Sequence, residues 1–282
     1  MKIGIIGNGF VGKATKNGFS KNTQVFTVDP KLKTTISQLI EFKPSFIFVC
    51  VPTPMNSDGT QDATILVNVL DDLFTSFTNT PLIIKSTVLP DILQDLENSY
   101  PSLIYNPEFL RENHAEEDFI NAPFIILGGE KKLCLKVKKL YEENSICKSK
   151  VFRITDISTA SLIKYSINCF LATKVTFFNQ IYDIFSKFDS DDSWEDFCSI
   201  LSLDERIGNS HMQVPGHDGR RGYGGACFPK DTAAFAKLSQ KLKTPMSLLI
   251  KSIIINDDIR SSYSEQIQRE IEQNVNFNFS DE

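Results

Sequence analysis

The feature that most constrains the fold is the alternation of short apolar runs with helical segments over residues 1–155. The runs are almost continuously hydrophobic, which predicts strands buried on both faces. They read KIGIIG, QVFTVD, FIFVCV, PLIIKST, SLIYNPEFL, FIILGG and KVFRIT. Segments with helical spacing lie between them, from Val11 and near 34–42, 62–77, 91–98 and 131–144. Buried strands that alternate with helices predict a doubly wound α/β domain, with a parallel sheet covered on both faces and ending near residue 155.

The second half of the chain, residues 156–282, follows a different pattern. Residues 156–188 keep helical periodicity without a proline or glycine, which predicts one long central helix that Asp156 or Ser158 could cap. Shorter helices are expected at 192–202, at 231–240 and after Pro245. We therefore expect a mostly helical second domain, interrupted by one glycine-rich loop between residues 204 and 231.

Composition narrows the class of partner. The 282 residues are 41% hydrophobic and 23% charged, which suits a globular chain with a sizeable core. The net charge of −5 argues against nucleic acid or an anionic membrane as the main partner. No apolar stretch approaches the ~18 residues of a membrane span, and the N-terminal MKIGIIG is typical of a strand rather than a signal peptide. We therefore expect a cytoplasmic protein.

The cysteines point to neither a metal site nor a disulfide framework. Six are scattered along the chain without C-x-x-C spacing: Cys50, Cys134, Cys147, Cys169, Cys198 and Cys227. For any one of them, composition alone favours a small buried apolar residue. No bound metal is expected.

Residues 7–12, GNGFVG, follow the first strand and open a helix. In this G-x-G-x-x-G spacing Gly7 permits a tight turn, Gly9 lets backbone approach a pyrophosphate, and Gly12 lets helix and strand pack closely. The next strand ends in Asp29, whose carboxylate can accept hydrogen bonds from a ribose 2′-OH and disfavours a 2′-phosphate. The sequence therefore predicts a Rossmann-type domain that binds NAD rather than NADP. Asn8, Phe10 and Val11 complete the predicted cofactor loop.

Two later strand ends add candidate ligand-binding residues. VPTP (51–54) and KSTV (85–88) fall at carboxyl ends of predicted parallel strands, the edge of an open α/β sheet where ligands bind. Thr53 and Thr87 are the candidates, and helix capping is the alternative interpretation for each.

Four stretches taken together resemble the UDP-glucose and GDP-mannose dehydrogenase family. They are GNGFVG, NPEFLRE (106–112), LIKYSINCFLATKVTFFNQ (162–180) and GYGGACFPKD (222–231), and DERIG (204–208) is similar to the family's Arg-Ile-Gly element. The resemblance implies oxidation of a nucleotide sugar's C6 alcohol to a carboxylate in two NAD-dependent steps, with UDP-glucose as the first choice of substrate. GDP-mannose and a UDP-N-acetylhexosamine are the alternatives within the class.

The resemblance makes Cys227 the nucleophile. A thiolate that adds to the aldehyde gives a thiohemiacetal, whose oxidation yields a thioester that water hydrolyses. Lys164 and Asn168, four residues apart on one helix face, would stabilise the alkoxide and the tetrahedral oxyanion. Three further residues would hold water, act as general base or orient these groups, in a division that the sequence leaves open. They are Thr87, Glu108 and Asp231.

Further contacts are implied by the same resemblance. Glu112 and Lys230 are expected near the cofactor, with Thr53 and Thr87. Substrate contacts are expected from Glu108, Phe109, Leu110, Arg111, Lys164, Asn168, Arg206, His211, Arg221 and Gly224. The family's central helix implies a homodimer, in which Arg206 would reach the neighbouring subunit's site.

The chain also departs from the family pattern. Members usually continue into a third, nucleotide-binding domain, which we expect to be absent here, leaving an NAD-binding domain (1–155) and a helical substrate and dimerisation domain (156–282). Such a chain would rely on a partner, bind the nucleotide with fewer contacts or use a different substrate. The segment 206–222 is longer than the usual loop and carries Arg220 and Arg221, and our hypothesis is that these arginines hold the substrate diphosphate that the missing domain would otherwise contact. Gln180 stands where the family has Glu.

Two further alternatives stay open, one a related enzyme and the other a protein of a different functional class. A β-hydroxyacid dehydrogenase shares the Rossmann and helical domains and a Lys/Asn pair, but has no need of Cys227. A non-catalytic NAD-binding scaffold would explain the expected loss of a domain, although every catalytic-type residue that can be matched is present.

Overall fold

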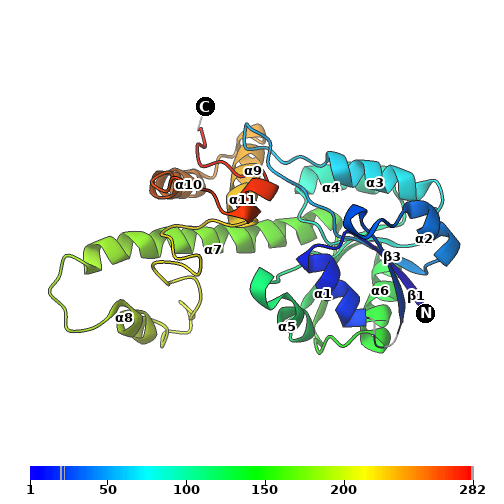
Figure 1. Cartoon of the computed structure of the whole chain (residues 1–282), viewed down its shortest axis with the longest axis horizontal. Helices are drawn as coiled ribbons and strands as arrows, with labels where there is room; N and C mark the ends of the chain where they lie inside the picture. The colour runs from blue at the N-terminus through cyan, green and yellow to red at the C-terminus, as the bar shows by residue number, and fades with distance from the viewer. Residues whose placement is uncertain (20, 22, 281–282) are drawn as a thin grey trace. The chain divides into compact units, whose positions relative to one another are not determined.

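The computed structural model describes residues 1–19, 21 and 23–280, which belong to two compact units (Figure 1). The first unit comprises Met1–Thr53 and Asp62–Lys164, and the second comprises Pro54–Gln61 and Tyr165–Glu282. Helix α7 (Ile157–Phe185) runs from the first unit into the second. The domain boundary expected at residue 155 stays a prediction.

A seven-stranded sheet organises the first unit, in the order β2-β1-β3-β4-β5-β6-β7. Its strands are β1 (Lys2–Ile6), β2 (Gln24–Val28), β3 (Phe46–Val49), β4 (Leu82–Ile84), β5 (Leu103–Tyr105), β6 (Ile125–Gly129) and β7 (Phe152–Thr155). Each predicted apolar run contributes one strand. The chain leaves β1 toward β2 and then continues at β3 on the other side of β1, so the strand order reverses there, which is where open α/β sheets bind ligands.

One strand pair departs from the predicted parallel arrangement. β1 to β5 pair in parallel, whereas β6 is antiparallel to β5, and β7 is parallel to β6. The connection from β5 to β6 holds a short 3-10 turn, η2 (Glu112–His114), and helix α5 (Ala115–Ile120), which was not predicted. An antiparallel strand begins at the end of the sheet where its neighbour ends. The chain between β5 and β6 therefore does not have to cross to the opposite end of the sheet.

Side chains of each strand alternate between two cores, one on each face of the sheet. In β3, Ile47 and Val49 belong to one core and Phe48 to the other; in β4, Leu82 and Ile84 belong to the first and Ile83 to the second. Burial on both faces therefore explains why these strands are apolar without a break.

Helices cover both faces, as Figure 1 shows for α3 and α4 on one side and α1, α5 and α6 on the other. The first core receives side chains from α2 (Ile36–Phe42), α3 (Thr64–Phe74) and α4 (Pro90–Ser99). The second core receives them from α1 (Phe10–Phe19), α5 and α6 (Lys131–Asn144). The prediction of a doubly wound α/β fold is confirmed.

The second unit is helical. It contains most of α7, with α8 (Trp194–Leu201), α9 (Phe228–Lys241), α10 (Ser247–Arg260) and α11 (Gln268–Glu272), of which α11 was not predicted. Helix α9 begins three residues before its predicted start, with Cys227 at its N-cap and Pro229 in its first turn, where proline is favoured. Cys169 of α7 packs against Leu249 and Ile253 of α10, which holds these two helices together.

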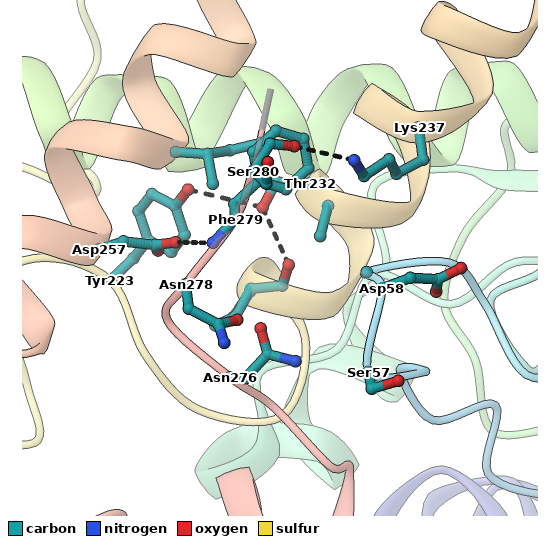
Figure 2. A pocket seen from close by; sticks show the side chains of 14 residues that line it. Ser57, Asp58, Tyr223, Thr232, Lys237, Asp257, Asn276, Asn278, Phe279 and Ser280 are labelled. Carbon is teal, nitrogen blue, oxygen red and sulfur yellow. Dashed lines mark hydrogen bonds between the residues drawn. The ribbon is translucent and has the colours of Figure 1, made fainter. Parts of the chain in front are cut away.

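Phe279 and Ser280 of the second unit are held beside a cavity of about 240 Å³ (Figure 2). Asp257 Oδ2 accepts the backbone N–H of Phe279 at 2.9 Å, and Lys237 Nζ donates to the carbonyl of Ser280 at 2.8 Å. Burial raises the pKa of Asp257 to about 6, against the opposing effect of the Phe279 hydrogen bond. The ionised carboxylate thus holds this segment at an electrostatic cost.

The substitution Asp257→Asn is expected to stabilise the protein at neutral pH. The folded state binds the Asp257 proton more tightly than an ordinary carboxyl of pKa 3.8, so ionisation opposes folding increasingly between those two pKa values and constantly above about 6. Asparagine removes this cost and keeps an oxygen for the Phe279 N–H. Thermal unfolding should show a Tm higher by a few degrees at about pH 7.5 and no gain below about pH 4. An unchanged Tm at about pH 7.5, equal to that of the exposed control Asp258→Asn, would contradict this account.

Candidate active site

The glycine loop after β1 has the geometry of a dinucleotide-binding turn. Gly7 has a φ of +97°, and a Cβ there would lie 2.5 Å from the carbonyl oxygen of Cys50. A Cβ on Gly12 would lie 2.0 Å from the carbonyl oxygen of Gly7, so the contact between α1 and the loop requires glycine. A Cβ on Gly9 would meet no described atom within 4 Å, which leaves that side of the loop open to a ligand.

Asp29, directly after β2, faces this loop. Its Oδ2 accepts the backbone N–H of Asn8 at 2.7 Å, and its Oδ1 accepts that of Lys31 at 2.8 Å. A carboxylate offers about four acceptor positions, so further positions are available to ribose hydroxyls. Phe10 and Val11 form the start of α1, whose N-terminus would face the pyrophosphate. The open side of Gly9 and the acceptor capacity of Asp29 fit NAD.

Thr53 and Thr87 join the ends of β3 and β4. Thr53 Oγ1 donates to the carbonyl oxygen of Thr87 at 2.8 Å, and both residues are buried. Helix α3 has Ala63 at its N-cap and α4 has Leu89, so the interpretation of either threonine as a helix cap is wrong. Both lie at the carboxyl edge of the sheet, where the sequence placed them.

Lys164 and Glu108 form a buried ion pair in the first unit. Lys164 Nζ lies 3.1 Å from Glu108 Oε1 and donates to the Glu108 carbonyl at 2.6 Å, and the two residues are 3% and 7% exposed. Glu108 Oε2 accepts the N–H of Leu110 at 2.6 Å, and the ring of Phe109 lies 5.1 Å from Lys164 Nζ. A fixed amine and carboxylate in a desolvated setting are suited to proton transfer and to stabilising an oxyanion.

A buried network that sequence reasoning missed supports the Glu108 turn. Lys85 Nζ donates to Asn106 Oδ1 at 3.1 Å, and the hydroxyl of Tyr141 donates to the same oxygen at 2.7 Å. Asn106 Nδ2 donates to the carbonyl of Ile126 at 2.9 Å. Burial lowers the pKa of Lys85, with the neighbouring Cys50 and Glu108 opposing. Lys85 lies in the KSTV stretch and Asn106 in the NPEFLRE stretch, and these two motifs were the sequence features that could have revealed the network.

The carboxylate of Asp231 holds the side chains of two other predicted site residues of the second unit, Asn168 and Lys230. Its Oδ2 accepts from Asn168 Nδ2 at 2.7 Å and its Oδ1 pairs with Lys230 Nζ at 2.6 Å. The three residues are at most 8% exposed. The backbone N–H of Asp231 donates to the carbonyl of Cys227 at 3.0 Å, in the first turn of α9. Asn168 of α7 therefore lies against the helical turn that begins at Cys227.

Predicted substrate residues elsewhere make contacts within the chain. Arg111 pairs with Asp118 at 2.7 Å, Arg206 with Asp204 in an exposed position, and Arg221 with Asp183 at 2.7 Å. Arg220 donates to the carbonyl of Glu265 and lies over the ring of Tyr263.

The other predicted residues lie as follows. The ring of His211 is 5.6 Å from that of Phe228, the residue after Cys227. Gly224 lies against Arg260, Glu112 begins the turn η2, and Gln180 is exposed on α7.

Two kinds of feature were not found in the described residues. Among the described residues, no group of three or more His, Cys, Asp and Glu side chains is placed to hold a metal ion. Within the same residues no helix has both the length and the apolar character that crossing a membrane requires.

Comparison with known families gives two adjacent matches. Residues 31–145 match the NAD binding domain of the UDP-glucose/GDP-mannose dehydrogenase family, and residues 158–258 match that family's central domain. A putative UDP-glucose 6-dehydrogenase of Bacillus subtilis is 34% identical over 235 residues, which cover 79% of this chain and 52% of the relative. The chain thus spans about half the length of the curated relatives it matches.

Solved structures share the fold. A UDP-glucose dehydrogenase from Pyrobaculum islandicum is similar with a TM-score of 0.74 and 22% identity, covering 91% of this chain and 68% of that one. A 3-hydroxyisobutyrate dehydrogenase from Mycobacterium tuberculosis is similar with a TM-score of 0.69 and 12% identity, covering 98% and 96%. At these identities the likeness is one of fold alone.

The two glycines of the cofactor loop are expected to respond differently to an added methyl group. Gly9→Ala places its Cβ in open space, so the protein should keep its Tm and bind NAD at least tenfold more weakly, because the methyl group meets the ligand. Gly12→Ala forces α1 away from the loop and should lower the free energy of unfolding by about 2 kcal/mol or more. Calorimetric titration with NAD and thermal unfolding distinguish the two; equal NAD affinity for Gly9→Ala and the unmodified chain would refute the assignment.

Proposed function

Because this chain belongs to the UDP-glucose/GDP-mannose dehydrogenase family, we propose that it oxidises the C6 alcohol of a nucleotide sugar to a carboxylate, with UDP-glucose as the preferred substrate. One NAD would accept a hydride in the first oxidation, and a second NAD, bound after the first NADH has left, would accept one in the second. We place the reaction in the cytoplasm, where the reducing environment keeps a nucleophilic thiol available.

The first oxidation converts the alcohol to an aldehyde. The hydroxyl proton must pass to a water molecule as the C6–H bond gives up its hydride to NAD, and the developing alkoxide needs a cation. Lys164 is the proposed cation, because its ammonium is buried and held by Glu108 at 3.1 Å. In a site closed to bulk water such a fixed charge stabilises an oxyanion strongly.

The second oxidation passes through Cys227. Its thiolate adds to the aldehyde carbon, forming a C–S bond and an oxyanion that Lys164 and Asn168 stabilise. Loss of hydride from the thiohemiacetal leaves a thioester, and water attacks its carbonyl, breaks the C–S bond and releases the carboxylate and the thiol. Glu108 is the proposed base for that water, and Thr87 would help to hold it. Cys227 is the N-cap of α9, where the helix dipole favours a thiolate.

One observation carries the proposal furthest. The hydrogen bond of 2.7 Å from Asn168 of α7 to Asp231 ties the proposed oxyanion donor to the first turn of α9, whose N-cap is Cys227. A β-hydroxyacid dehydrogenase would use the lysine and asparagine without needing the cysteine. The fold is similar to that of a 3-hydroxyisobutyrate dehydrogenase over nearly the full length of both chains, and for this reason the β-hydroxyacid dehydrogenase is retained as the alternative function.

The number of NADH molecules released per substrate molecule distinguishes the two proposed functions. The unmodified protein should release two NADH per UDP-glucose, whereas Cys227→Ser should release at most one and lose at least 1,000-fold in kcat, about 4 kcal/mol of transition-state stabilisation. Cys198→Ser is the matched control, because the Cys198 thiol donates to the backbone carbonyl of Met212 and has no role in the proposed chemistry, so this variant should behave as the unmodified protein.

Two outcomes would overturn the assignment. A fully active Cys227→Ser protein would favour the β-hydroxyacid dehydrogenase. No turnover with any sugar in a panel of UDP- and GDP-sugars, despite NAD binding, would favour the scaffold.

A homodimer through α7 completes the proposal. Phe170, Phe177 and Ile184 recur every seven residues on this helix and are 67%, 55% and 57% exposed. Such a heptad stripe is the pattern by which helices pair, and large apolar side chains in a row are unusual on a monomer's surface. The side chain of Arg206 is 89% exposed, and we propose that it contacts the substrate bound to the partner subunit.

The substitution Phe177→Glu should dissociate the dimer. A charge at the middle of the stripe would be buried without a partner on association, so light scattering after size exclusion should give the mass of one chain. The control is Phe188→Glu, which alters a phenylalanine that is 71% exposed and lies beyond the end of α7, and it should leave the dimer intact. If both variants and the unmodified protein have the same mass, the α7 stripe is not the interface.

A further inference from the structure

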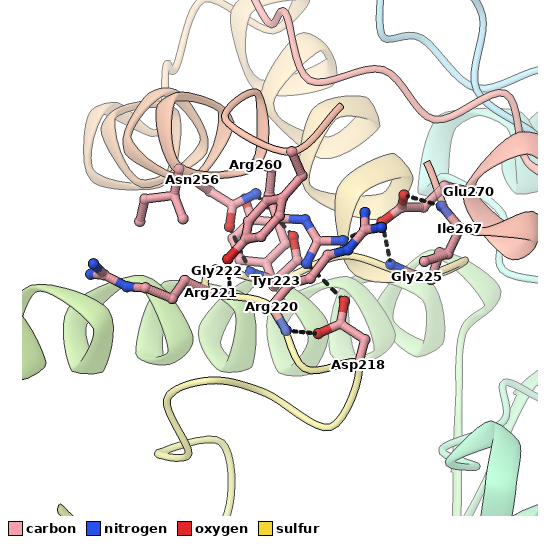
Figure 3. Close-up of polar contacts among 12 residues, drawn as sticks. Asp218, Arg220, Arg221, Gly222, Tyr223, Gly225, Asn256, Arg260, Ile267 and Glu270 are labelled. Carbon is pink, nitrogen blue, oxygen red and sulfur yellow. Dashed lines mark hydrogen bonds and ion pairs between the residues drawn. The ribbon is translucent and has the colours of Figure 1, made fainter. Parts of the chain in front are cut away.

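The glycine-rich loop that leads to Cys227 is held by buried side chains from outside it (Figure 3). Asn179 Oδ1 accepts the N–H of Gly222 at 3.0 Å. Asn256 accepts the N–H of Tyr223 at 2.7 Å and donates to the carbonyl of Tyr223 at 3.1 Å. Glu270 Oε1 accepts the N–H of Gly225 at 3.1 Å, two residues before Cys227. Three segments distant in sequence thus fix the loop backbone.

Glu270 is fully buried and its charge is balanced by Arg260. Arg260 Nη2 lies 2.7 Å from Glu270 Oε1, the same oxygen that accepts from Gly225, and Arg260 is 3% exposed. Glu270 Oε2 accepts the N–H of Ile267 at 3.0 Å, and Arg260 Nη1 pairs with Asp218 at 2.8 Å. Both carboxylate oxygens of Glu270 and both terminal nitrogens of Arg260 are thereby occupied, as a buried ion pair requires.

The loop is shaped to fit the pair. A Cβ on Gly224 would lie 2.2 Å from Arg260 Nη2 and 2.4 Å from Glu270 Oε1, so backbone and guanidinium are in direct contact. Gly222 and Gly225 have φ values of +73° and +80°, which other residues adopt at a cost. A segment with this much backbone freedom keeps one conformation only when something external fixes it.

We propose that the Arg260–Glu270 ion pair is a positioning device for Cys227, one that fixes the Gly225 backbone and so sets the direction in which the thiol points. The inference rests on the proposed function of Cys227 as nucleophile. Neither residue touches a reacting atom, and both lie beyond residues 158–258 that match the central domain. The C-terminal segment, through Glu270, thus acts on the nucleophile loop.

The test uses Glu270→Gln, which keeps an oxygen for the Gly225 N–H and loses the charge, and Glu270→Ala, which loses both. Glu272→Ala, on the same helix and more exposed, is the matched control. Two readouts are taken on the full chain: kcat and KM with UDP-glucose and NAD, and the rate at which iodoacetamide alkylates Cys227, followed by mass spectrometry of its peptide.

We expect Glu270→Ala to lower kcat at least about 30-fold with the KM for NAD within about twofold, and to change the alkylation rate of Cys227 at least about fivefold while that of Cys147 is unchanged. Glu270→Gln should recover part of the kcat, and Glu272→Ala should match the unmodified chain. Should Glu270→Ala fail to fold, Glu270→Gln and Arg260→Lys carry the same two readouts.

Unchanged kcat and unchanged Cys227 alkylation in a folded Glu270→Ala or Glu270→Gln protein would overturn the inference, as would an equal effect on Cys147. Absence of NADH from the unmodified chain with every nucleotide sugar would overturn the proposed function instead. In that case an altered Cys227 alkylation rate in the Glu270 variants would still support the positioning of the loop.

Discussion

The buried carboxylate of Asp231 is the interaction on which the candidate chemistry of the second unit depends. It is 1% exposed and is held by Asn168 on one oxygen and by Lys230 on the other. An ionised group in such a place is stable only if its partners remain, so the position of α7 relative to the start of α9 is set by electrostatics as well as by packing. The contact between Asn168 and Asp231 also helps to position Cys227, because Cys227 is the N-cap of the helical turn that contains Asp231.

The first unit follows the same principle with different groups. Lys164 and Glu108 are buried as a pair, and the turn that presents Glu108 is fixed by Asn106, which accepts from Lys85 and Tyr141. Burying three ionisable side chains is costly compared with apolar packing, and nothing in the sheet's own stability requires it. Costly polar groups gathered at the carboxyl edge of a parallel sheet are therefore better explained by chemistry than by folding.

Much of this arrangement could be predicted from the sequence because it is local. The strands were recognisable since both of their faces are buried, and the cofactor loop because glycine is required at Gly7 and Gly12 for steric reasons that the spacing encodes. Helix α9 was predicted to start too late, although Pro229 marked its first turn.

Other features depend on partners far along the chain. The reversal of β6 is decided by pairing between strands, and the short helices α5 and α11 are stabilised by tertiary packing, which a short stretch of sequence does not reveal. Arg220 and Arg221 were assigned to a diphosphate because neither Glu265 nor Asp183 is near them in sequence. Arg260 and Glu270 lie in no motif, and only the folded chain brings them to the Cys227 loop.

The proposed function depends on Cys227 carrying the substrate as a thioester during the second oxidation. The most direct measurement is rapid acid quenching of the protein during turnover of UDP-glucose with NAD, followed by mass spectrometry of the peptide that contains Cys227. We expect an added mass equal to the acylated nucleotide sugar, located on Cys227 and removed by hydroxylamine as a thioester is. Release of two NADH per sugar without any adduct, or with the adduct on another cysteine, would show that Cys227 is not the nucleophile.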